Sequence, residues 1–373
     1  MKIGIVTIID FNNYGNRLQN YATQEILKSF NHEVITILNT PKRINYRNNS
    51  IAFSNVILNF LSRIRKLFFP RKVERLINKA NKNRFTALSE FSKRFINLSD
   101  FIAIEGVMPK NKIRNFDLFI TGSDQIWNPY FRFGSSFDFL DFTSKTRISF
   151  SSSFGIDEIP IEYVEKYQFY LKNFKYISVR EHEGALIVKK LINISPIVLL
   201  DPTLLLEIEH WNNFRKESLY KPKSAYILTY FLGKKPKSLD LFLNKIRTNS
   251  KYKIIELNSL NHFNLYSISP NEFIDLIASS SLVFTDSFHG LAFSIIFKRP
   301  FFICNRITNG PPMDSRINSI LNLFNFENRR WKDEIDPNSL FDVDFSNNQN
   351  ILALERKKCT EYLNEIFNDS LFK

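Results

Sequence analysis

Cysteine is nearly absent from this chain, since Cys304 and Cys359 are the only two among its 373 residues. Two thiols cannot build a disulfide framework or a paired CxxC metal knuckle, so we expect a reducing, cytoplasmic compartment. Long apolar runs are also missing: the longest nearly apolar stretch, residues 51–61, falls far short of the roughly 18 residues that a membrane span needs. Residues 1–11 have the pattern of a buried strand and lack the parts of a signal peptide. The sequence therefore predicts a soluble protein.

Glycine and proline are scarce as well, with 10 and 14 residues. Together with 44% hydrophobic and 24% charged residues, this scarcity excludes collagen-like, low-complexity and broadly disordered chains. Neither GxGxxG nor GxxxxGK[ST] occurs, so the sequence does not support a dinucleotide-binding or nucleotide-hydrolysing loop. The five histidines are scattered without the spacing of metal ligands, and we expect no metal site.

Positive charge is plentiful but confined to one segment. The formal net charge is +14, and residues 42–94 alone hold fourteen Lys and Arg against two acids, which gives +12 there and +2 elsewhere. Residues 51–69 mix bulky apolar side chains with basic ones, and residues 71–94 continue as a charged helical stretch. An amphipathic helix at an anionic membrane surface has this composition, but a core-packed helix beside a solvated one has it equally. No recognised nucleic-acid-binding module surrounds the segment, so we expect no nucleic acid partner.

Short β-branched runs alternate with helical patterns along the whole chain, which predicts a parallel α/β architecture. A proline- and lysine-rich stretch near 221–223 precedes a second series of strands and helices. We predict two domains: residues 1–200 with a basic helical insert at 42–94, and residues 201–373 with a final helix at 351–367. Open parallel sheets bind ligands beyond the carboxyl ends of their strands, so residues directly after the predicted strands are the candidates for a site.

The strongest candidate segment is 282–290, where an apolar strand stops and a helix opens. Asp286 or Ser287 would cap that helix. His289 would lie in the first turn beside Gly290, where free N–H groups and the helix dipole favour anions. An imidazole in that place can exchange a proton near neutral pH. On the local sequence alone, ordinary helix capping with a packed surface histidine is an equally good interpretation.

Two further loops follow predicted strands. After the strand at 117–121, polar residues and then an aromatic one form a set of cleft candidates: Gly122, Ser123, Asp124, Gln125 and Trp127. From this segment alone we favour an ordinary Asx-type turn with the tryptophan packed beneath it. The loop after the first strand holds four more cleft candidates: Asn13, Gly15, Asn16 and Arg17. This loop occupies the place of a phosphate loop, although a tight turn explains it as well.

Two arginines are candidates for anion binding. Arg180 ends the predicted strand at 176–179, where a planar guanidinium can hold a carboxylate or a phosphate with two hydrogen bonds. Glu181 or Glu183 can instead neutralise Arg180 in a structural ion pair, which is the favoured interpretation of that segment by itself. Arg316 lies early in a later predicted helix and is the second candidate.

With these motifs in place, the sequence resembles the polysaccharide pyruvyl transferase family. Six segments carry the resemblance, in this order: GIVTIIDFNNYGNRLQNYATQEIL, FITGSDQIWNP, FSSSFG, ISVREHEG, LLDPTLLL and VFTDSFHGLAFSIIFKRPFF. Residues 42–110 are covered least. The resemblance implies an α/β fold of two Rossmann-like domains facing a central cleft, as in GT-B proteins. It also implies transfer of the pyruvyl group of phosphoenolpyruvate to two hydroxyls of a sugar as a ketal, without a metal or a cofactor.

The resemblance implies roles for single residues. Arg180 corresponds to the arginine that grips the anionic groups of the donor, and His289 corresponds to the histidine of the family's Arg-Leu-His pattern. Ser287 stands where many members have arginine, so one cationic contact of the donor site is missing. Arg316 or Arg17 would have to replace that cation. We expect the donor site to hold Ser287 and Gly290 beside the two arginines.

We expect His289 to deliver a proton to the methylene carbon of the donor, with Asp286 orienting the imidazole or the sugar. The acceptor would be a sugar of a cell-surface polysaccharide, such as a capsule or an exopolysaccharide, or of its lipid-linked precursor. Residues 42–94 would then hold the protein at the anionic inner face of the cell membrane. Two other functions stay open: a GT-B glycosyltransferase using a nucleotide sugar, and a non-catalytic protein of the same fold that binds membranes or polyanions.

Overall fold

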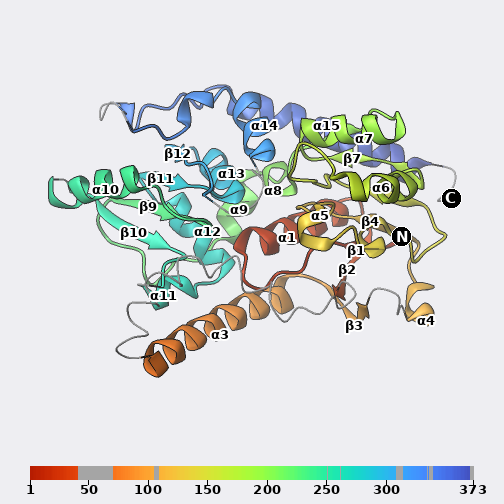
Figure 1. The fold of residues 1–373 in the computed structure, drawn as a ribbon, viewed down its shortest axis with the longest axis horizontal. Helices are drawn as coiled ribbons and strands as arrows, with labels where there is room; N and C mark the ends of the chain where they lie inside the picture. Colours follow the sequence, from red (N-terminus) through yellow and green to blue (C-terminus); the bar gives the residue numbers. More distant parts are fainter. Residues whose placement is uncertain are drawn as a thin grey trace.

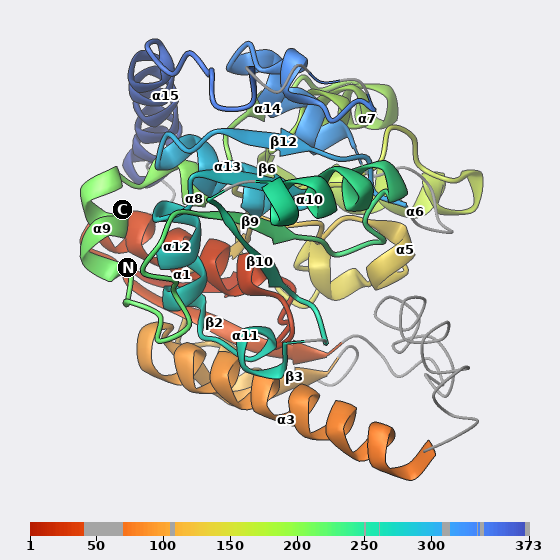
Figure 2. The ribbon, with the colours of Figure 1, turned by 90° about the vertical axis from the view of Figure 1, so that its left-hand side faces the viewer.

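The computed structural model describes residues 1–40, 70–104, 109–249, 251–260, 262–307, 314–333, 335 and 339–369. Two parallel sheets, one from each half of the chain, lie side by side with helices around them (Figures 1 and 2). The predicted fold class is therefore confirmed: two Rossmann-like α/β units in a GT-B-like arrangement. The boundary near residue 200 stays a prediction.

The sheet of the first half has the order β3-β2-β1-β4-β5-β6, and all its neighbouring strands run parallel. Its strands are β1 (Lys2–Val6), β2 (Glu33–Thr40), β3 (Leu98–Ile104), β4 (Leu118–Thr121), β5 (Arg147–Ser149) and β6 (Phe174–Tyr176). The central strands β1 and β4 are almost continuously apolar because helices and loops cover both faces of a parallel sheet. The sequence analysis missed β3, an edge strand on which Ile102 and Ile104 are exposed.

Two short strands, β7 (Ser178–Val179) and β8 (Ile197–Val198), pair in a separate parallel sheet. The strand predicted at 176–179 is thus divided between two sheets, with the break at Ile177. This division matters for function because it ends β7 at Val179, directly before Arg180.

The sheet of the second half has the order β10-β9-β11-β12 and is also parallel throughout. Its strands are β9 (Tyr226–Tyr230), β10 (Lys253–Leu257), β11 (Leu282–Thr285) and β12 (Phe301–Ile303). All four side chains of β11 are buried, as expected for a central strand with a helix on each face. The predicted strand before His289 is confirmed with its bounds unchanged.

The helices follow the strands as the alternating pattern predicted. Their bounds are α1 (Tyr14–Lys28), α3 (Pro70–Phe95), α4 (Lys110–Ile113), α5 (Pro129–Arg132), α6 (Val164–Leu171), α7 (His182–Ile192), α8 (Pro202–Leu205), α9 (Ile208–Phe214), α10 (Lys237–Asn249), α11 (Phe263–Tyr266), α12 (Pro270–Ala278), α13 (Phe288–Ile296), α14 (Ser315–Leu323) and α15 (Asn348–Asn368). Short 3₁₀ turns are η1 (Ser136–Phe139), η2 (Ile161–Tyr163) and η3 (Glu327–Arg329). The start of α12 has a capping box between Ser269 and Glu272.

The two halves pack directly against each other through α1 and α12. The ring of Tyr14 stacks on that of Phe273 with 4.9 Å between ring centroids, and its hydroxyl donates to the Tyr266 carbonyl at 3.0 Å. Arg84 of α3 adds a second connection, because its guanidinium donates to the Asn12 carbonyl in one half and to the Asn258 side chain in the other. The carboxyl ends of the two sheets are thereby held close together.

The last helix, α15, returns to the first half of the molecule, where hydrogen bonds connect it and its C-cap to β5 and β6. Tyr362 donates from its hydroxyl to the Ser149 carbonyl at 2.7 Å, and Tyr176 donates to the Asp369 carboxylate at 2.6 Å. The sequence assigned this helix to the second domain by position along the chain. It also packs against α8, which in turn contacts α1 of the first half.

The basic segment is described only in part. The apolar and basic stretch at 51–69 lies outside the described residues, whereas the helix predicted at 71–94 is confirmed as α3. None of the helices in the described part of the chain combines the length and the apolar character needed to cross a membrane.

Candidate active site

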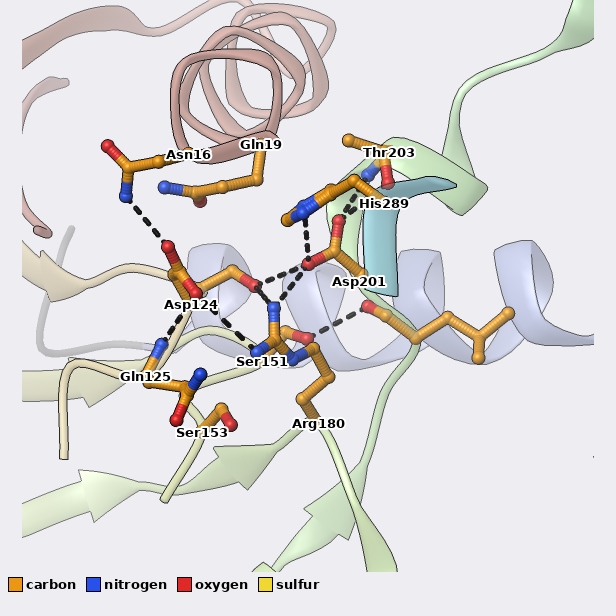
Figure 3. Close-up of polar contacts among 12 residues, drawn as sticks. Asn16, Gln19, Asp124, Gln125, Ser151, Ser153, Arg180, Asp201, Thr203 and His289 are labelled. Atoms are coloured by element: carbon orange, nitrogen blue, oxygen red, sulfur yellow. Dashed lines mark hydrogen bonds and ion pairs between the residues drawn. The ribbon is translucent and has the colours of Figure 1, made fainter. Parts of the chain in front are cut away.

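Most of the predicted site residues converge where the carboxyl ends of the two sheets meet. Asn13, Gly15 and Asn16 lie at the start of α1, after β1; Asp124 follows β4, Arg180 follows β7, and His289 lies in the first turn of α13, after β11. Figure 3 shows the side chains of Asn16, Asp124, Arg180 and His289 pointing toward one another, with Asp201 among them. Parallel strands direct their carboxyl ends to one edge, so the topology itself assembles this cluster.

Arg180 is buried, with one edge of its guanidinium paired and the other unpaired. Nη1 lies 2.6 Å from Oδ2 of Asp201 in a buried ion pair. Nε and Nη2 donate no hydrogen bond within the described part of the chain; their nearest carboxylates are Glu181 at 3.9 Å and Asp124 at 3.7 Å. Burial alone would lower the pKa of Arg180, but Asp201 and the other two carboxylates raise it, so the group stays charged. The Nε–Nη2 edge is the one that can hold a carboxylate with two hydrogen bonds.

His289 is 6% exposed and lies against Asp201. Its Nε2 is 3.7 Å from Oδ2 of Asp201 and has no hydrogen-bond partner among the residues that the structure describes. Burial lowers the pKa of His289 and outweighs the opposite effect of Asp201 and Asp124, while Arg180 and Arg316 lower it further. The imidazole is therefore neutral at neutral pH, and a bound anion would favour its protonation.

Gly15 makes room for the imidazole. A Cβ at this position would overlap with Nδ1 and Cγ of His289, so the first turn of α1 approaches the ring as closely as glycine permits. The backbone of one half thus fixes the position of a side chain from the other half.

We expect Gly15→Ala to displace His289 and to lower turnover by roughly 10- to 100-fold, because a shift of about 1 Å in a reacting group can cost that much. The melting temperature should fall only modestly, since overpacking typically costs about 1–3 kcal/mol. The matched control is Gly184→Ala in α7, where the added Cβ would have no neighbour nearer than 3.2 Å. Unchanged turnover in Gly15→Ala would show that the position of the imidazole does not matter.

Asp124 connects the first half's loop to Arg180. Its Oδ2 accepts a hydrogen bond from Nδ2 of Asn16 at 2.7 Å, and its Oδ1 faces Nη2 of Arg180. Burial would raise the pKa of Asp124, but Arg180, His289 and Arg316 lower it to about 2. This carboxylate is permanently ionised and holds Arg180 and Asn16 in place.

Arg316 is the second buried cation, and it shares Phe288 with Arg180. The ring centroid of Phe288 lies 4.6 Å from Cζ of Arg180 and 5.5 Å from Cζ of Arg316. With its amide oxygen toward Arg316, Gln125 accepts from Nη1 and Nη2 at 3.2 and 2.8 Å. Burial and the neighbouring Arg180 charge lower the pKa of Arg316 to about 9, and its Nε is without a partner in the described residues. Two like charges this close favour an anion between them.

Two helix N-termini open on the cluster. Asn13 caps α1 by accepting from the Asn16 N–H, and Ser287 caps α13 by accepting from the Gly290 N–H. His289 is in the first turn of α13, beside the N–H groups of that helix end. The positive ends of both helix dipoles add to the two arginines and favour a bound anion.

Other predicted site residues have structural contacts. The Asp286 carboxylate accepts from the backbone N–H groups of Leu232 and Gly233, both at 2.7 Å, and therefore ties β11 to the loop after β9. Trp127 is fully buried and donates to the Asp138 carbonyl, as the packed interpretation predicted. Arg17 is buried and donates to the Asn16 side chain and to the Ile8 carbonyl.

The remaining predicted residues line or support the cluster. Ser123 donates from its hydroxyl to Oδ2 of Asp201 at 3.1 Å, which places it in the centre of the site. Gly122 donates its N–H to the Val6 carbonyl and forms part of the end of β4. Gly290 packs against Thr285, and a Cβ there would meet the threonine side chain at 2.6 Å.

The sequence analysis missed Asp201. Its Oδ2 accepts hydrogen bonds from Arg180 and Ser123 and lies near Nε2 of His289. Its Oδ1 accepts hydrogen bonds from the backbone N–H and the hydroxyl of Thr203. A signal was present in the sequence, since Asp201 directly follows the apolar run at 197–200, as the other site residues follow strands. Asp201 is the carboxylate that orients both Arg180 and His289.

The described residues contain no group of three or more His, Cys, Asp or Glu side chains arranged to hold a metal ion. The fold and the site together define an α/β protein with a buried, cationic anion-binding cluster between two parallel sheets. Residues 13–307 match the polysaccharide pyruvyl transferase family, and the chain belongs to that family. Membership supports a transferase that modifies polysaccharides.

Solved structures with similar overall arrangements share little sequence with this chain. A putative UDP-N-acetylglucosamine 2-epimerase from Listeria monocytogenes is 8% identical, with 99% of this chain and 97% of that one covered and a TM-score of 0.48. The ADP-heptose heptosyltransferase II of E. coli is 12% identical, with 98% and 100% covered and a TM-score of 0.36. A glycosyltransferase from Rickettsia africae is 12% identical, with 99% of each chain covered and a TM-score of 0.43. No curated protein sequence matches this chain.

Proposed function

We propose that this protein moves the pyruvyl group of phosphoenolpyruvate onto two hydroxyls of a sugar, forming a pyruvate ketal. The sugar would belong to a cell-surface polysaccharide, such as a capsule or an exopolysaccharide, or to its lipid-linked precursor. One observation carries this proposal: Arg180, Arg316 and His289 lie close enough to act on one another electrostatically, and each has a buried nitrogen with no hydrogen-bond partner among the described residues. Each buried donor left unpaired costs about 1–3 kcal/mol, so a site with several such donors is suited to a small polyanion.

Phosphoenolpyruvate fits the chemistry of these donors. Its planar carboxylate would accept two hydrogen bonds from the free Nε–Nη2 edge of Arg180. Its phosphate would be bound by Arg316 and by the N–H groups at the start of α13, next to Ser287. Arg316 is then the cation that compensates for the arginine missing at position 287.

The reaction needs a proton on the methylene carbon while positive charge develops on the neighbouring carbon. His289 would supply this proton, because the trianionic donor favours the imidazolium form that the empty site disfavours. Asp201, at 3.7 Å from Nε2, would stabilise the imidazolium and keep the ring in position. Proton transfer and charge stabilisation are the only requirements, so the proposed chemistry uses no metal and no cofactor.

The test is a coupled assay of the purified protein with phosphoenolpyruvate and a panel of lipid-linked or arylated sugars. We expect phosphate release that depends on the acceptor, together with a mass gain of one pyruvyl ketal on that acceptor. Nucleotide release from a nucleotide sugar, without phosphate from phosphoenolpyruvate, would instead establish a glycosyltransferase. Binding of lipid or polyanion with no turnover on any glycan would establish a non-catalytic protein.

We further propose that α3 contacts an anionic membrane surface peripherally. Four exposed cations of α3 repeat at spacings that keep them on one face of the helix: Arg75, Lys79, Lys82 and Lys93. Each basic residue near an anionic surface contributes about 1 kcal/mol. This helix also contacts α1 and α11, so a membrane under α3 would lie next to both halves of the molecule.

Changing Arg75, Lys79 and Lys82 together to glutamine should weaken co-sedimentation with anionic liposomes roughly 100-fold, because about 3 kcal/mol of attraction is removed. Binding of the unmodified protein should also fall as salt is added, since salt screens exposed charges. The control triple variant removes three exposed lysines elsewhere: Lys189, Lys190 and Lys357. Binding that ignores salt and lipid charge, or that the control weakens equally, would contradict the assignment to α3.

A further inference from the structure

Asp10 is an acidic residue beside the cluster, and the proposed reaction assigns it no role. It follows β1 in the loop that leads to α1, and it is only partly buried. Its backbone N–H donates to Oδ1 of Asn16 at 2.9 Å, and Nδ2 of the same Asn16 donates to Asp124. Asp124 in turn faces Arg180, so one asparagine links Asp10 to the anion-binding cluster.

Each of the other four carboxylates of the site lies within ion-pair distance of an arginine. Asp201 is paired with Arg180 and accepts from two further side chains, and Asp124 faces Arg180 and accepts from Asn16. One oxygen of Glu181 accepts three hydrogen bonds, and Asp286 accepts from two backbone N–H groups. These contacts hold the four carboxylates in structural roles.

Asp10 differs from this group. Its Oδ1 accepts one hydrogen bond, from the Asn12 N–H at 2.8 Å, and it forms no ion pair within the described residues. Three charged groups face it: Arg17 from α1, Arg84 from α3 and Asp124 from the loop after β4. Burial raises the pKa of Asp10, the Asn12 N–H and the two arginines lower it, Asp124 raises it, and the net direction is upward. Asp10 is therefore a better proton acceptor than the ion-paired Asp124.

We propose that Asp10 is the general base that accepts the proton of the first acceptor hydroxyl. This role rests on the proposed function. In the first step the hydroxyl oxygen forms a bond to the central carbon of phosphoenolpyruvate, its proton passes to Asp10, and the carbon–carbon π pair takes a proton from His289. In the second step the oxygen of the second acceptor hydroxyl bonds to the same carbon, and the carbon–oxygen bond to phosphate breaks. The proton of this second hydroxyl passes to His289, which is protonated again. The phosphate, or water, then takes the proton from Asp10, so atoms and charge balance without an oxidant or reductant.

The position of Asp10 suits this division of labour. His289 comes from the second half of the molecule and Asp10 from the loop after β1 in the first half, and Asn16 and Asp124 connect Asp10 to Arg180. A sugar that enters between the two sheets would thus meet the base and the proton donor from different halves. One residue would then not have to protonate a carbon and deprotonate an oxygen in the same step.

The experiment compares Asp10→Asn with the unmodified protein at saturating phosphoenolpyruvate. We expect kcat to fall by roughly 10²–10⁴-fold, the range typical for loss of a general base. The dissociation constant for phosphoenolpyruvate, measured by calorimetry, should change less than about threefold, because Asp10 does not touch the donor. The acidic limb of the kcat profile should disappear, since the base that must lose its proton before turnover is gone. Asp10→Glu should keep that limb.

Asp117→Asn is the matched control. Asp117 also accepts a hydrogen bond from a backbone N–H, but it lies before β4, at the amino ends of the strands and away from the cluster. Near-normal turnover of Asp10→Asn, or a retained acidic limb, would overturn the proposal. An equal loss of donor affinity and turnover would overturn it too, because it would indicate a positioning role. If the unmodified protein itself neither binds phosphoenolpyruvate nor releases phosphate, the proposed function fails, and the role of Asp10 fails with it.

Discussion

Replacing His289 with glutamine is expected to lower kcat by roughly 10²–10⁴-fold while phosphoenolpyruvate still binds within a few-fold of normal affinity. Glutamine is polar and close in size, so the packing against Gly15 should survive. It cannot give up a proton, which removes the step that makes the methylene carbon a methyl group. Steady-state phosphate release gives kcat, and calorimetry gives the donor affinity.

The same variant tests the charge state of the imidazole. Burial lowers the pKa of His289 in the empty site, whereas a bound trianion raises it, so donor binding near neutral pH should take up a proton. This uptake is measured by calorimetry in buffers of different ionisation enthalpy, and it should vanish in His289→Gln. The control is His32→Gln, because His32 lies beside the amino terminus and directly before β2, whereas the cluster lies at the carboxyl ends of the strands. Turnover close to normal in His289→Gln would show that another group delivers the proton.

Replacing Arg180 with lysine is expected to raise the dissociation constant for phosphoenolpyruvate by roughly 10- to 150-fold. This range corresponds to one lost charge-assisted hydrogen bond, about 1.5–3 kcal/mol. Lysine keeps a positive charge near Asp201, so the buried carboxylate is not left without a cation. It has no planar pair of N–H groups, so the two-bond grip on the donor carboxylate is lost.

Calorimetric titration with phosphoenolpyruvate checks this result, and thermal unfolding checks that the variant is folded. Arg247→Lys is the control, because Arg247 is an exposed arginine paired with Glu256 on the surface of the second half. Arg180→Ala is the harsher variant and should also destabilise the fold, since removing one partner of a buried ion pair typically costs about 3–5 kcal/mol. An unchanged donor affinity in Arg180→Lys would place the anion elsewhere.

Local patterns were enough to predict most elements of the fold. The strand at 282–285 and the capped start of α12 follow from neighbouring residues, because apolar runs and capping groups act over a few positions. The edge strand β3 escaped prediction because it exposes Ile102 and Ile104, which breaks the expected burial pattern. Prediction of the strand at 176–179 failed in detail because sheet pairing, which depends on distant residues, separates Tyr176 from Ser178.

Most residues of the site were predicted from the sequence, but the contacts between them were not. Arg180, Asp124 and His289 were all candidates because each follows a strand, and the sequence offered Glu181 or Glu183 as partners of Arg180. The structure places Glu181 3.9 Å from Arg180, but the closest partner of Arg180 is Asp201 at 2.6 Å. No local rule could identify that partner, because the two residues follow different strands, β7 and β8, and meet only when those strands pair.

The sequence by itself determined the α/β class, the alternation of elements and the positions at which polar groups follow strands, because these depend on short-range periodicity and on turn chemistry. Tertiary structure alone decided that His289 lies against Gly15 and Asp201, that α15 returns to the first half, and that Asp10 lies beside the cluster with no ion pair among the described residues. These features arise from contacts between segments far apart in the chain, and such contacts exist only after the two sheets have packed with their carboxyl ends together.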